Sequence, residues 1–316
     1  MAAIVASSGS TPRGAGSRML VTKNGIKAGT IGGGAVEHRA MEIALEALKA
    51  GESFFRSFCL TRSQTADLGM VCGGDVKVYF QYVSPDDSQA VLLCSQILEA
   101  LKEDKDSWLL LDLTNEPSWN MSLVSPAPGA KEIAPEFLPY LGPKACQFTA
   151  GERSYYAEPL VQAGTVYVFG GGHVAQELVP LLSHVGFRCV VMDDREDFAN
   201  QKLFPQAAAT ITGDMSRIGD YVRITGRDYV CIMTRGHQYD YLVQKQVLPL
   251  KPRYIGIMGS KNKIHVVTEK LLADGFSLEE INACHMPIGT RILAQTPAEI
   301  AVSVAGELIM VRAKGR

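Results

Sequence analysis

The chain has 316 residues, of which 47% are hydrophobic and 20% charged, and its formal net charge is −2. This balance is typical of a globular protein of two ordinary domains, and it excludes a basic field that would hold nucleic acid or an anionic membrane. The apolar runs fall short of the roughly 20 residues that span a bilayer, and the seven cysteines form no CxxC pair, so we expect a cytoplasmic protein without a zinc ribbon or a disulfide framework.

The first half of the chain predicts a mixed α+β domain. Short apolar strands are expected at residues 3–6, 17–22, 27–29, 76–82 and 108–113, and amphipathic helices at 36–48 and 89–101. Residues 115–143 are rich in proline and turn-forming residues, which predicts surface loops and the connection between two domains. We place the boundary within 150–163 and draw the domains as 1–155 and 156–316.

The second half predicts a Rossmann-type domain. The strand Val166–Phe169 runs into a glycine cluster, after which apolar residues recur at helical spacing. Further short strands are expected at 187–192, 208–212, 229–234 and 254–258, separated by helical stretches. Capping boxes at Ser277–Glu280 and Thr296–Glu299 predict two later helix starts. The predicted fold class is α/β, with a C-terminal Rossmann-type, doubly wound parallel sheet and a smaller N-terminal α+β domain.

The turn after the first Rossmann strand predicts a phosphate site. Gly170 permits the tight turn, Gly171 and Gly172 let the backbone approach a phosphate, and His173 opens a helix whose N-terminal N–H groups attract anions. Asp193 ends the next strand about 20 residues further on, where such folds place a carboxylate that binds ribose. In the alternative interpretation the glycines only make a tight turn in a domain that binds no phosphate.

Three later loops are expected at the same edge of the sheet, the last of them at Pro287–Thr290. In the first, Arg235 suits a phosphate or carboxylate, Gly236 exposes backbone, and His237 can transfer a proton. The second holds Gly259 and Ser260. The alternative for Arg235 is an ordinary ion pair with Asp240 or another surface acid.

Three glycine-rich segments of the N-terminal half predict a second ligand-binding face. Each combines flexible backbone with one or two reactive side chains, although hairpin turns would also explain the glycines. The expected ligand-binding residues are Ser10, Thr11 and Arg13; Gly32, Gly33, Gly34 and Glu37; and Cys72, Gly73 and Gly74. As a thiolate, Cys72 can bind a soft metal or attack an electrophile, whereas most lone cysteines are small hydrophobic residues.

Six short motifs follow one another along the chain in the order given below. SSGSTPRGAGSRMLV, GTIGGGAVE, DLGMVCGG, VFGGGHVAQEL, TRGHQYD and IGIMGSKNK together resemble the xanthine dehydrogenase accessory (XdhC/CoxI-type) family. The resemblance implies a maturation factor rather than a catalyst. Such a factor binds the molybdenum cofactor (molybdopterin), assists its sulfuration, with a cysteine desulfurase as a possible partner, and delivers it to a molybdenum hydroxylase apoenzyme of the xanthine dehydrogenase type.

The chain departs from the family at two places. Members usually have a helix before the first strand, and many have a cysteine where this chain has Ala35. An alternative function is an NAD(P)-dependent oxidoreductase that uses the Rossmann domain, and a third is a structural partner of a larger enzyme. We expect a homodimer, because Rossmann-based two-domain proteins often dimerise.

Overall fold

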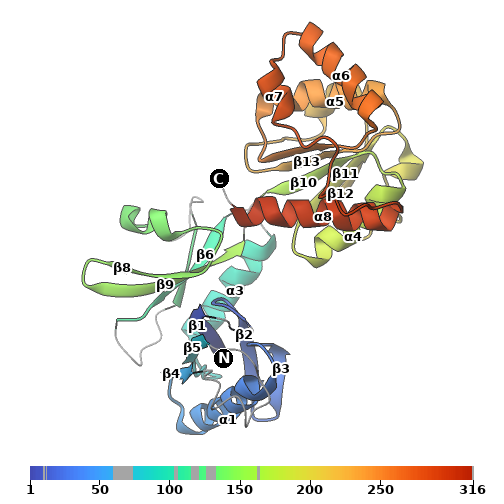
Figure 1. Ribbon diagram of the computed structural model, residues 1–316. Helices are drawn as coiled ribbons and strands as arrows, with labels where there is room; N and C mark the ends of the chain where they lie inside the picture. Colours follow the sequence, from blue (N-terminus) through green and yellow to red (C-terminus); the bar gives the residue numbers. More distant parts are fainter. Residues whose placement is uncertain are drawn as a thin grey trace. The chain divides into compact units, whose positions relative to one another are not determined.

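The computed structural model divides the chain into two compact units, which we call the N-terminal unit, Met1–Gln162, and the C-terminal unit, Ala163–Arg316 (Figure 1). It describes residues 1–9, 11, 13–59, 74–102, 106–114, 121–125, 133–161 and 164–314. The N-terminal unit is slightly the longer of the two, so the expectation of a smaller N-terminal domain is wrong. Among the described residues, no helix is long and apolar enough to cross a membrane.

The N-terminal unit begins with an antiparallel sheet of order β3-β2-β1-β5-β4. Its strands are β1 (Ala2–Gly9), β2 (Arg18–Thr22), β3 (Gly25–Gly29), β4 (Phe54–Cys59) and β5 (Gly74–Phe80). Helix α1 (Gly34–Ala50) covers one face, because Ala40, Ala44 and Ala47 recur at helical spacing and are buried against the strands. The helix ends at Gly51, whose φ of 70° is a left-handed cap that favours glycine.

A second antiparallel sheet of the N-terminal unit has the order β7-β6-β9-β8. Its strands are β6 (Ser107–Asp112), β7 (Met121–Val124), β8 (Cys146–Ala150) and β9 (Arg153–Val161), and the unit also holds helix α3 (Ser88–Lys102) and the 3-10 helix η1 (Pro135–Tyr140). The hairpin β8–β9 lies where the sequence predicts the domain boundary, and β9 runs through the division drawn between 155 and 156. Buried Val5, Tyr79, Leu111 and Tyr156 pack together and join the two sheets.

The C-terminal unit is a parallel sheet of order β12-β11-β10-β13-β14, which confirms the Rossmann-type prediction. The strands are β10 (Thr165–Phe169), β11 (Arg188–Asp193), β12 (Ala209–Thr212), β13 (Tyr229–Ile232) and β14 (Tyr254–Ile257). Because β11 and β13 flank β10 on opposite sides, the strand order reverses at β10. Ligands of such sheets bind beyond the carboxyl ends of the strands at this point.

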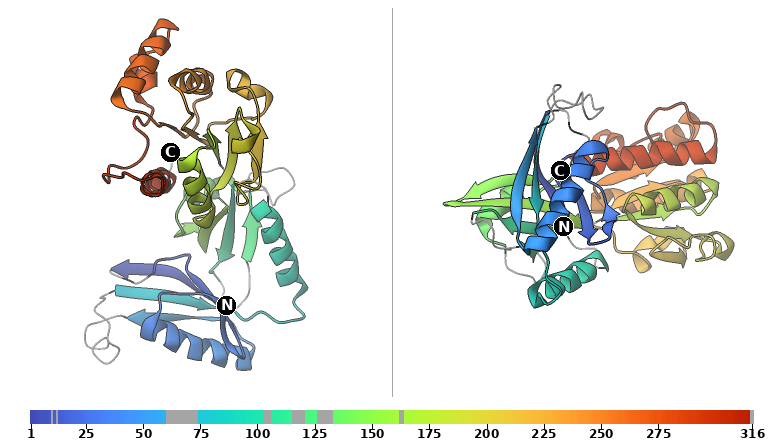
Figure 2. Two further views of the ribbon diagram at one scale, coloured as in Figure 1. Left: turned by 90° about the vertical axis from the view of Figure 1, so that its right-hand side faces the viewer. Right: turned by 90° about the horizontal axis from the view of Figure 1, so that it is seen from below.

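Helices cover both faces of the parallel sheet (Figure 2). Helices α4 (His173–His184) and α8 (Pro297–Lys314) lie on one face, and α5 (His237–Val247) and α6 (Lys261–Ala273) lie on the other, followed by the short helix α7 (Leu278–Asn282). Between β11 and β13 the chain forms the 3-10 turns η2 (Glu196–Phe198) and η3 (Met215–Asp220) in place of the expected helices, and η4 (Leu248–Leu250) follows α5.

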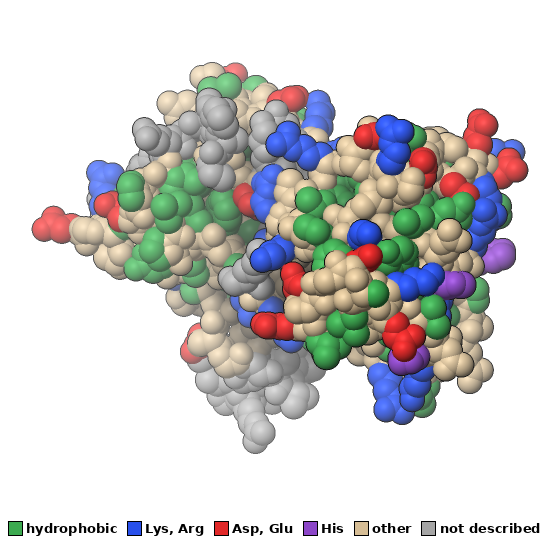
Figure 3. Space-filling view, turned by 90° about the horizontal axis from the view of Figure 1, so that it is seen from above, with side chains coloured by type: hydrophobic (Ala, Val, Ile, Leu, Met, Phe, Trp, Pro, Cys, Tyr) green, Lys and Arg blue, Asp and Glu red, His purple; other side chains and the backbone are tan. Residues whose placement is uncertain are grey.

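Both predicted capping boxes are present. Ser277 and Glu280 bond reciprocally at the start of α7, and Thr296 and Glu299 do so at the start of α8. On the face of the protein shown in Figure 3, acidic and basic side chains are interspersed rather than gathered into a field of one sign, in keeping with the net charge of −2.

Candidate functional site

The glycine turn between β10 and α4 assigns a different task to each glycine. Gly170 has a φ of 107°, and a Cβ there would overlap the carbonyl group of Met233 in the loop after the neighbouring strand. A Cβ at Gly171 would overlap the carbonyl oxygen of Phe198. Only Gly172, the N-cap residue of α4, has no atom within 4 Å of an added Cβ. Close packing therefore requires Gly170 and Gly171, while Gly172 leaves open space at the helix N-terminus, as a bound anion needs.

Asp193 ends β11 as predicted, but its carboxylate braces the glycine turn. The side chain is 2% exposed and accepts the N–H of Gly171 at 2.9 Å. Arg195 donates its backbone N–H and two guanidinium N–H groups to the same carboxylate at 2.9–3.1 Å. Burial by itself would raise the pKa of Asp193, but the hydrogen bonds from Arg195 and Gly171 outweigh it and hold the pKa below its usual value. Ribose binding by Asp193 stays a prediction, and the contacts in this structure give the residue a structural role instead.

The loop after β13 lies beside the glycine turn, because Phe169 and Ile232 are paired at the ends of β10 and β13. His173 and His237 are the exposed first residues of α4 and α5. Arg235, whose side chain is 54% exposed, binds Asp194 at 3.1 Å and not Asp240. The structure therefore brings the predicted residues of the glycine turn and of the loop after β13 together at one edge.

A buried ion pair that sequence reasoning missed lies at the same edge. Asp240 is 0% exposed, and its carboxylate contacts the ammonium of Lys263 on α6 and accepts the hydroxyl of Thr234 at 2.5 Å. Burial raises the pKa of Asp240, and the bonds from Lys263 and Thr234 oppose the shift only in part. The signal was available, because Asp240 shares the buried face of α5 with Val243 and Val247.

The predicted Gly259 and Ser260 have local structural roles. The hydroxyl of Ser260 accepts the backbone N–H of Lys263 at 3.3 Å and caps α6. A Cβ at Gly259 would lie 3.1 Å from the side chain of Lys263, so the glycine makes room for the lysine that pairs with Asp240.

In the N-terminal unit, Glu37 closes its own glycine loop. Its carboxylate accepts the hydroxyl of Thr30 and the backbone N–H groups of Ile31 and Gly33, the latter two at 2.9 and 3.2 Å. The Thr30 hydroxyl is the main cause of the lowered pKa of Glu37. Gly32 donates its N–H to Thr30, so the loop N–H groups that we expected to face a ligand are bonded within the loop. Gly32, Gly33 and Gly34 all have positive φ, which explains the glycines by backbone geometry.

The strand register places the described parts of the N-terminal motifs at two ends of the sheet. Gly9 pairs with Gly74, so the end of β1 that leads to Thr11 and Arg13 lies beside the start of β5. The second motif follows Gly29, which pairs with Met19, and Met19 pairs with Ala2 at the other end of β1. The second motif therefore starts at the opposite end of β1 from the first, and a face shared with the third motif stays a prediction because residues 60–73 lie outside the described part of the chain. Ser10, Cys72 and Gly73 lie outside the described residues, and the exposed Arg13 stays a predicted ligand contact.

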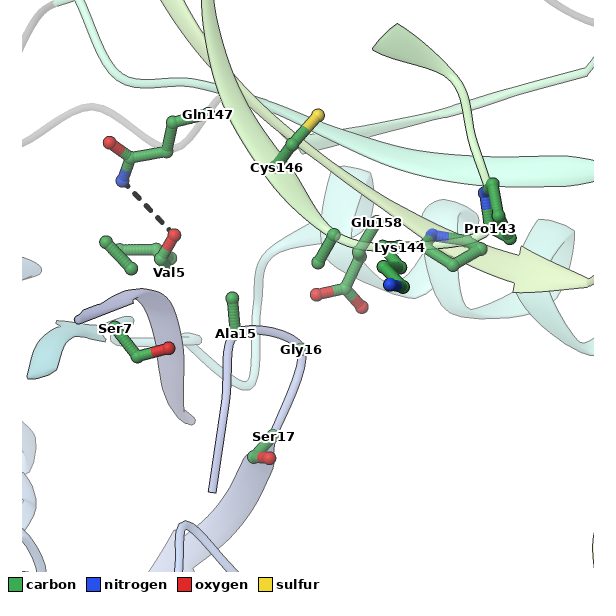
Figure 4. Close-up of a pocket in the computed structure, with 13 residues that line it drawn as sticks. Val5, Ser7, Ala15, Gly16, Ser17, Pro143, Lys144, Cys146, Gln147 and Glu158 are labelled. Atoms are coloured by element: carbon green, nitrogen blue, oxygen red, sulfur yellow. Dashed lines mark hydrogen bonds between the residues drawn. The ribbon is translucent and has the colours of Figure 1, made fainter. Parts of the chain in front are cut away.

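A cavity of about 700 Å³ opens in the N-terminal unit beside the first of these motifs (Figure 4). It lies between β1, the loop at 15–17 and the hairpin β8–β9, and its polar lining comes from Ser7, Ser17, Lys144, Cys146, Gln147 and Glu158. The carboxylate of Glu158 points into this space, whereas the sulfur of Cys146 points away and donates to the carbonyl of Tyr140 at 3.3 Å.

Glu158 is a charged side chain held in place beneath the cavity. It is 7% exposed, contacts the guanidinium of Arg18 and accepts the hydroxyl of Tyr156 at 2.7 Å. Burial and the nearby carboxylate raise the pKa of Tyr156, so its hydroxyl stays a donor to Glu158. Sequence reasoning missed this site because it expected no strand over β9, although an acid within an apolar run is the sequence signal of a buried charge.

Comparison with known proteins identifies both units. Residues 166–308 match the family model described as the XdhC Rossmann domain, and residues 1–58 match the XdhC and CoxI family. The chain belongs to the XdhC and CoxI family. The two matches together take in more than half of the chain, and the resemblance inferred from the six motifs is confirmed.

Curated relatives of this XdhC/CoxI chain align with nearly all of it. It is 24% identical over 99% of its length to a Bacillus subtilis (strain 168) protein named as a probable subunit of xanthine dehydrogenase, covering 92% of that protein. It is 23% identical over 99% of its length to the uncharacterized protein YqeB of Escherichia coli (strain K12), but it spans only 43% of that relative. A crystal structure described as a xanthine dehydrogenase from Bacillus halodurans is 23% identical in sequence. The alignment covers 100% of this chain and 91% of the solved chain, with a TM-score of 0.79. At this identity the solved structure shows the fold alone.

In the parts of the chain that the structure covers, no group of three or more His, Cys, Asp or Glu side chains is placed to hold a metal ion. Burial raises the pKa of Cys146, of Cys189 to about 12 and of Cys284 to about 11, so these thiols are protonated at neutral pH and are poor ligands or nucleophiles.

Proposed function

We propose that this protein is an accessory factor that binds the molybdenum cofactor, assists its sulfuration and delivers it to a molybdenum hydroxylase apoenzyme of the xanthine dehydrogenase type. Family membership supports the link to this enzyme class, and so do the names of the Bacillus relatives. The proposal includes a cysteine desulfurase as sulfur donor. It makes the chain a binding and delivery protein, with the redox chemistry carried out by the hydroxylase.

The cavity of the N-terminal unit is the observation that carries the proposal. Its volume of about 700 Å³ lies within the range of pockets that hold cofactors. A pterin presents N–H donors and ring acceptors, and these suit the carboxylate of Glu158, the hydroxyls of Ser7 and Ser17 and the amide of Gln147. The ammonium of Lys144 suits the phosphate of the cofactor. When bound, the group supplies a molybdenum held by a dithiolene, and the residues of this chain bind and orient it.

Cys72 is proposed as the thiol beside the metal or its exchangeable sulfur. Cys189 and Cys284 are buried, and burial raises the pKa of both thiols, so neither suits that role. The sulfur of Cys146 points away from the cavity. A Cys72→Ala variant that retained the cofactor and matured the hydroxylase normally would overturn this part of the proposal, leaving cofactor binding itself intact.

The cavity is tested by filling it. Ser7 and Ser8 are consecutive exposed residues of β1, and only Ser7 lines the cavity. Because successive strand residues face opposite sides, Ser7→Trp should block the cavity and Ser8→Trp should leave it open. Ultrafiltration with anaerobically released molybdenum cofactor should show at least about tenfold weaker binding for Ser7→Trp and wild-type binding for Ser8→Trp, on the order of 1.4 kcal/mol or more. Equal binding by the two variants would place the cofactor elsewhere.

A further inference from the structure

Helix α3 presents an apolar face that the described residues of the N-terminal unit do not cover. Only Ala90 and Leu93 of this helix are buried. Val91 and Leu98 are each 60% exposed, Leu101 is 57% exposed, and Cys94 is also exposed. We call these four residues, Val91, Cys94, Leu98 and Leu101, the α3 stripe.

The spacing of the α3 stripe is that of a helix–helix seam. At 3.6 residues per turn the four side chains fall within an arc of about 80°, directly beside the buried face of the helix. Their separations of three, four and three residues are the a and d positions of a heptad repeat. A stripe of this kind is unfavourable in water, because monomeric proteins seldom expose large contiguous apolar surface.

The stripe is symmetric about Gln96. Val91 and Leu101 lie at equal distances along the helix on either side of it, and so do Cys94 and Leu98. A second copy of the helix, turned by a two-fold axis at Gln96, therefore places Val91 on Leu101 of its partner and Cys94 on Leu98. Self-complementarity of this kind is what an isologous dimer interface requires.

The helix dipoles favour the antiparallel arrangement of two α3 helices over the parallel one. Residues 88–97 carry no charged side chain, while Glu99 and Lys102 lie in the last turn and bond to each other at 2.9 Å. In an antiparallel pair Lys102, at the edge of the stripe, lies beside the uncharged first half of the partner, and the two helix dipoles oppose each other. A parallel pair would align the two dipoles, which is less favourable.

We propose that the α3 stripe is the site at which a second copy of this chain binds, helix antiparallel to helix. Two stripes with their polar flanks would bury on the order of 1,000 Å², which lies at the lower end of specific interfaces and predicts a dimer that dissociates on dilution in the micromolar range. The proposal is independent of cofactor binding and is tested on the protein without cofactor.

The first test compares two leucines of one helix. Leu98 and Leu92 are both 60% exposed, but on the helical wheel Leu92 lies about 100° from Val91 and further from the rest of the stripe. Sedimentation equilibrium of the full chain under reducing conditions should show a monomer–dimer equilibrium. Leu98→Glu should weaken dimerisation by at least about 100-fold, because it places a carboxylate against the partner's Cys94. Leu92→Glu should change it by less than about threefold.

The second test does not depend on the stability of a charged variant. On oxidation, the cysteine of the Leu98→Cys variant should form a disulfide with Cys94 of the other copy. The Leu98→Cys, Cys94→Ser double variant should form no such cross-link, and Leu92→Cys should form none either. Cross-linking that survives Cys94→Ser would indicate parallel helices and overturn the arrangement. A wild-type protein that stays monomeric throughout the micromolar range, or that loses its dimer equally with Leu92→Glu and Leu98→Glu, would overturn the interface.

Discussion

Substitution of Gly171 by alanine should strongly destabilise the C-terminal unit, although it adds a single methyl group. The new Cβ would overlap the carbonyl oxygen of Phe198, lie 2.8 Å from its carbonyl carbon and lie 3.3 Å from the ring of Phe204. Since two of these atoms belong to the backbone of η2, the turn must move. Overpacking of this kind costs about 1–3 kcal/mol. Movement would also weaken the bond from the Gly171 N–H to Asp193, a bond to a charged group worth about 1.5–3 kcal/mol.

The two terms together predict a loss of about 3–5 kcal/mol, which lowers the Tm of a unit of this size by about 10 °C. Differential scanning calorimetry of the full chain measures it, because a two-unit protein need not unfold in one transition. Gly172→Ala is the matched control: its φ is −69° and no atom lies within 4 Å of the new Cβ, so the cost should not exceed about 1 kcal/mol. A Gly171→Ala protein that melts together with Gly172→Ala would refute the assigned packing.

Three further substitutions test the contacts of the carboxylates of Asp193, Glu37 and Asp240. The pKa of Asp193 is lower in the folded than in the unfolded protein, so its stabilising effect is present above the unfolded pKa of about 3.9 and is lost as pH falls through the folded value. Asp193→Asn should therefore flatten the fall of Tm below about pH 4. A Tm profile in acid that is the same as that of the wild type would contradict this. Glu37→Gln weakens three hydrogen bonds within the glycine loop and should lower the free energy of unfolding in urea by about 1–3 kcal/mol. Glu46→Gln, at an exposed position, should lower it by less than about 0.5 kcal/mol. Equal losses would mean that the carboxylate of Glu37 does not stabilise the loop. Lys263→Met leaves the carboxylate of Asp240 buried without its cation and should lower the free energy of unfolding by about 3–5 kcal/mol. Substitution of the exposed Lys261 by methionine should lower it by less than about 0.5 kcal/mol. Similar thermal stability of the two variants would argue against the ion pair.

The Rossmann unit could be predicted from the sequence because its signals are local. Short apolar strands, helical apolar spacing and capping residues each act over a few positions, and all pointed to the same fold. The requirement for Gly170 followed from its turn in the same way. The 3-10 turns η2 and η3 were missed because local propensity does not distinguish a short 3-10 turn from the start of a full helix.

The hairpin β8–β9 could not be recognised from periodicity. Gln147 and Glu158 interrupt its apolar pattern, yet both have partners across the N-terminal unit: Gln147 donates to the carbonyl of Val5 at 3.2 Å, and Glu158 contacts Arg18. A polar residue that is satisfied by a distant strand reads locally as a loop residue. The cavity that these strands line was hidden from the sequence for the same reason.

The contacts of Glu37 and Asp193 with their own glycine loops were not predicted, and ligand binding by either residue stays a prediction. Both carboxylates were expected to meet a ligand, and both accept N–H groups of the glycine loops beside them. A glycine-rich loop with positive φ leaves N–H groups unpaired, and a nearby acid satisfies them as well as a bound anion does. Sequence spacing cannot distinguish these two outcomes.

Equilibrium binding of the purified protein to anaerobically released molybdenum cofactor, in parallel with NAD(H) and NADP(H), tests the proposed function most directly. We predict stoichiometric binding of the cofactor, and transfer of the bound cofactor to a xanthine dehydrogenase-type apoenzyme. Tight binding of a nicotinamide nucleotide without any binding of the molybdenum cofactor would contradict the proposal and indicate an oxidoreductase instead.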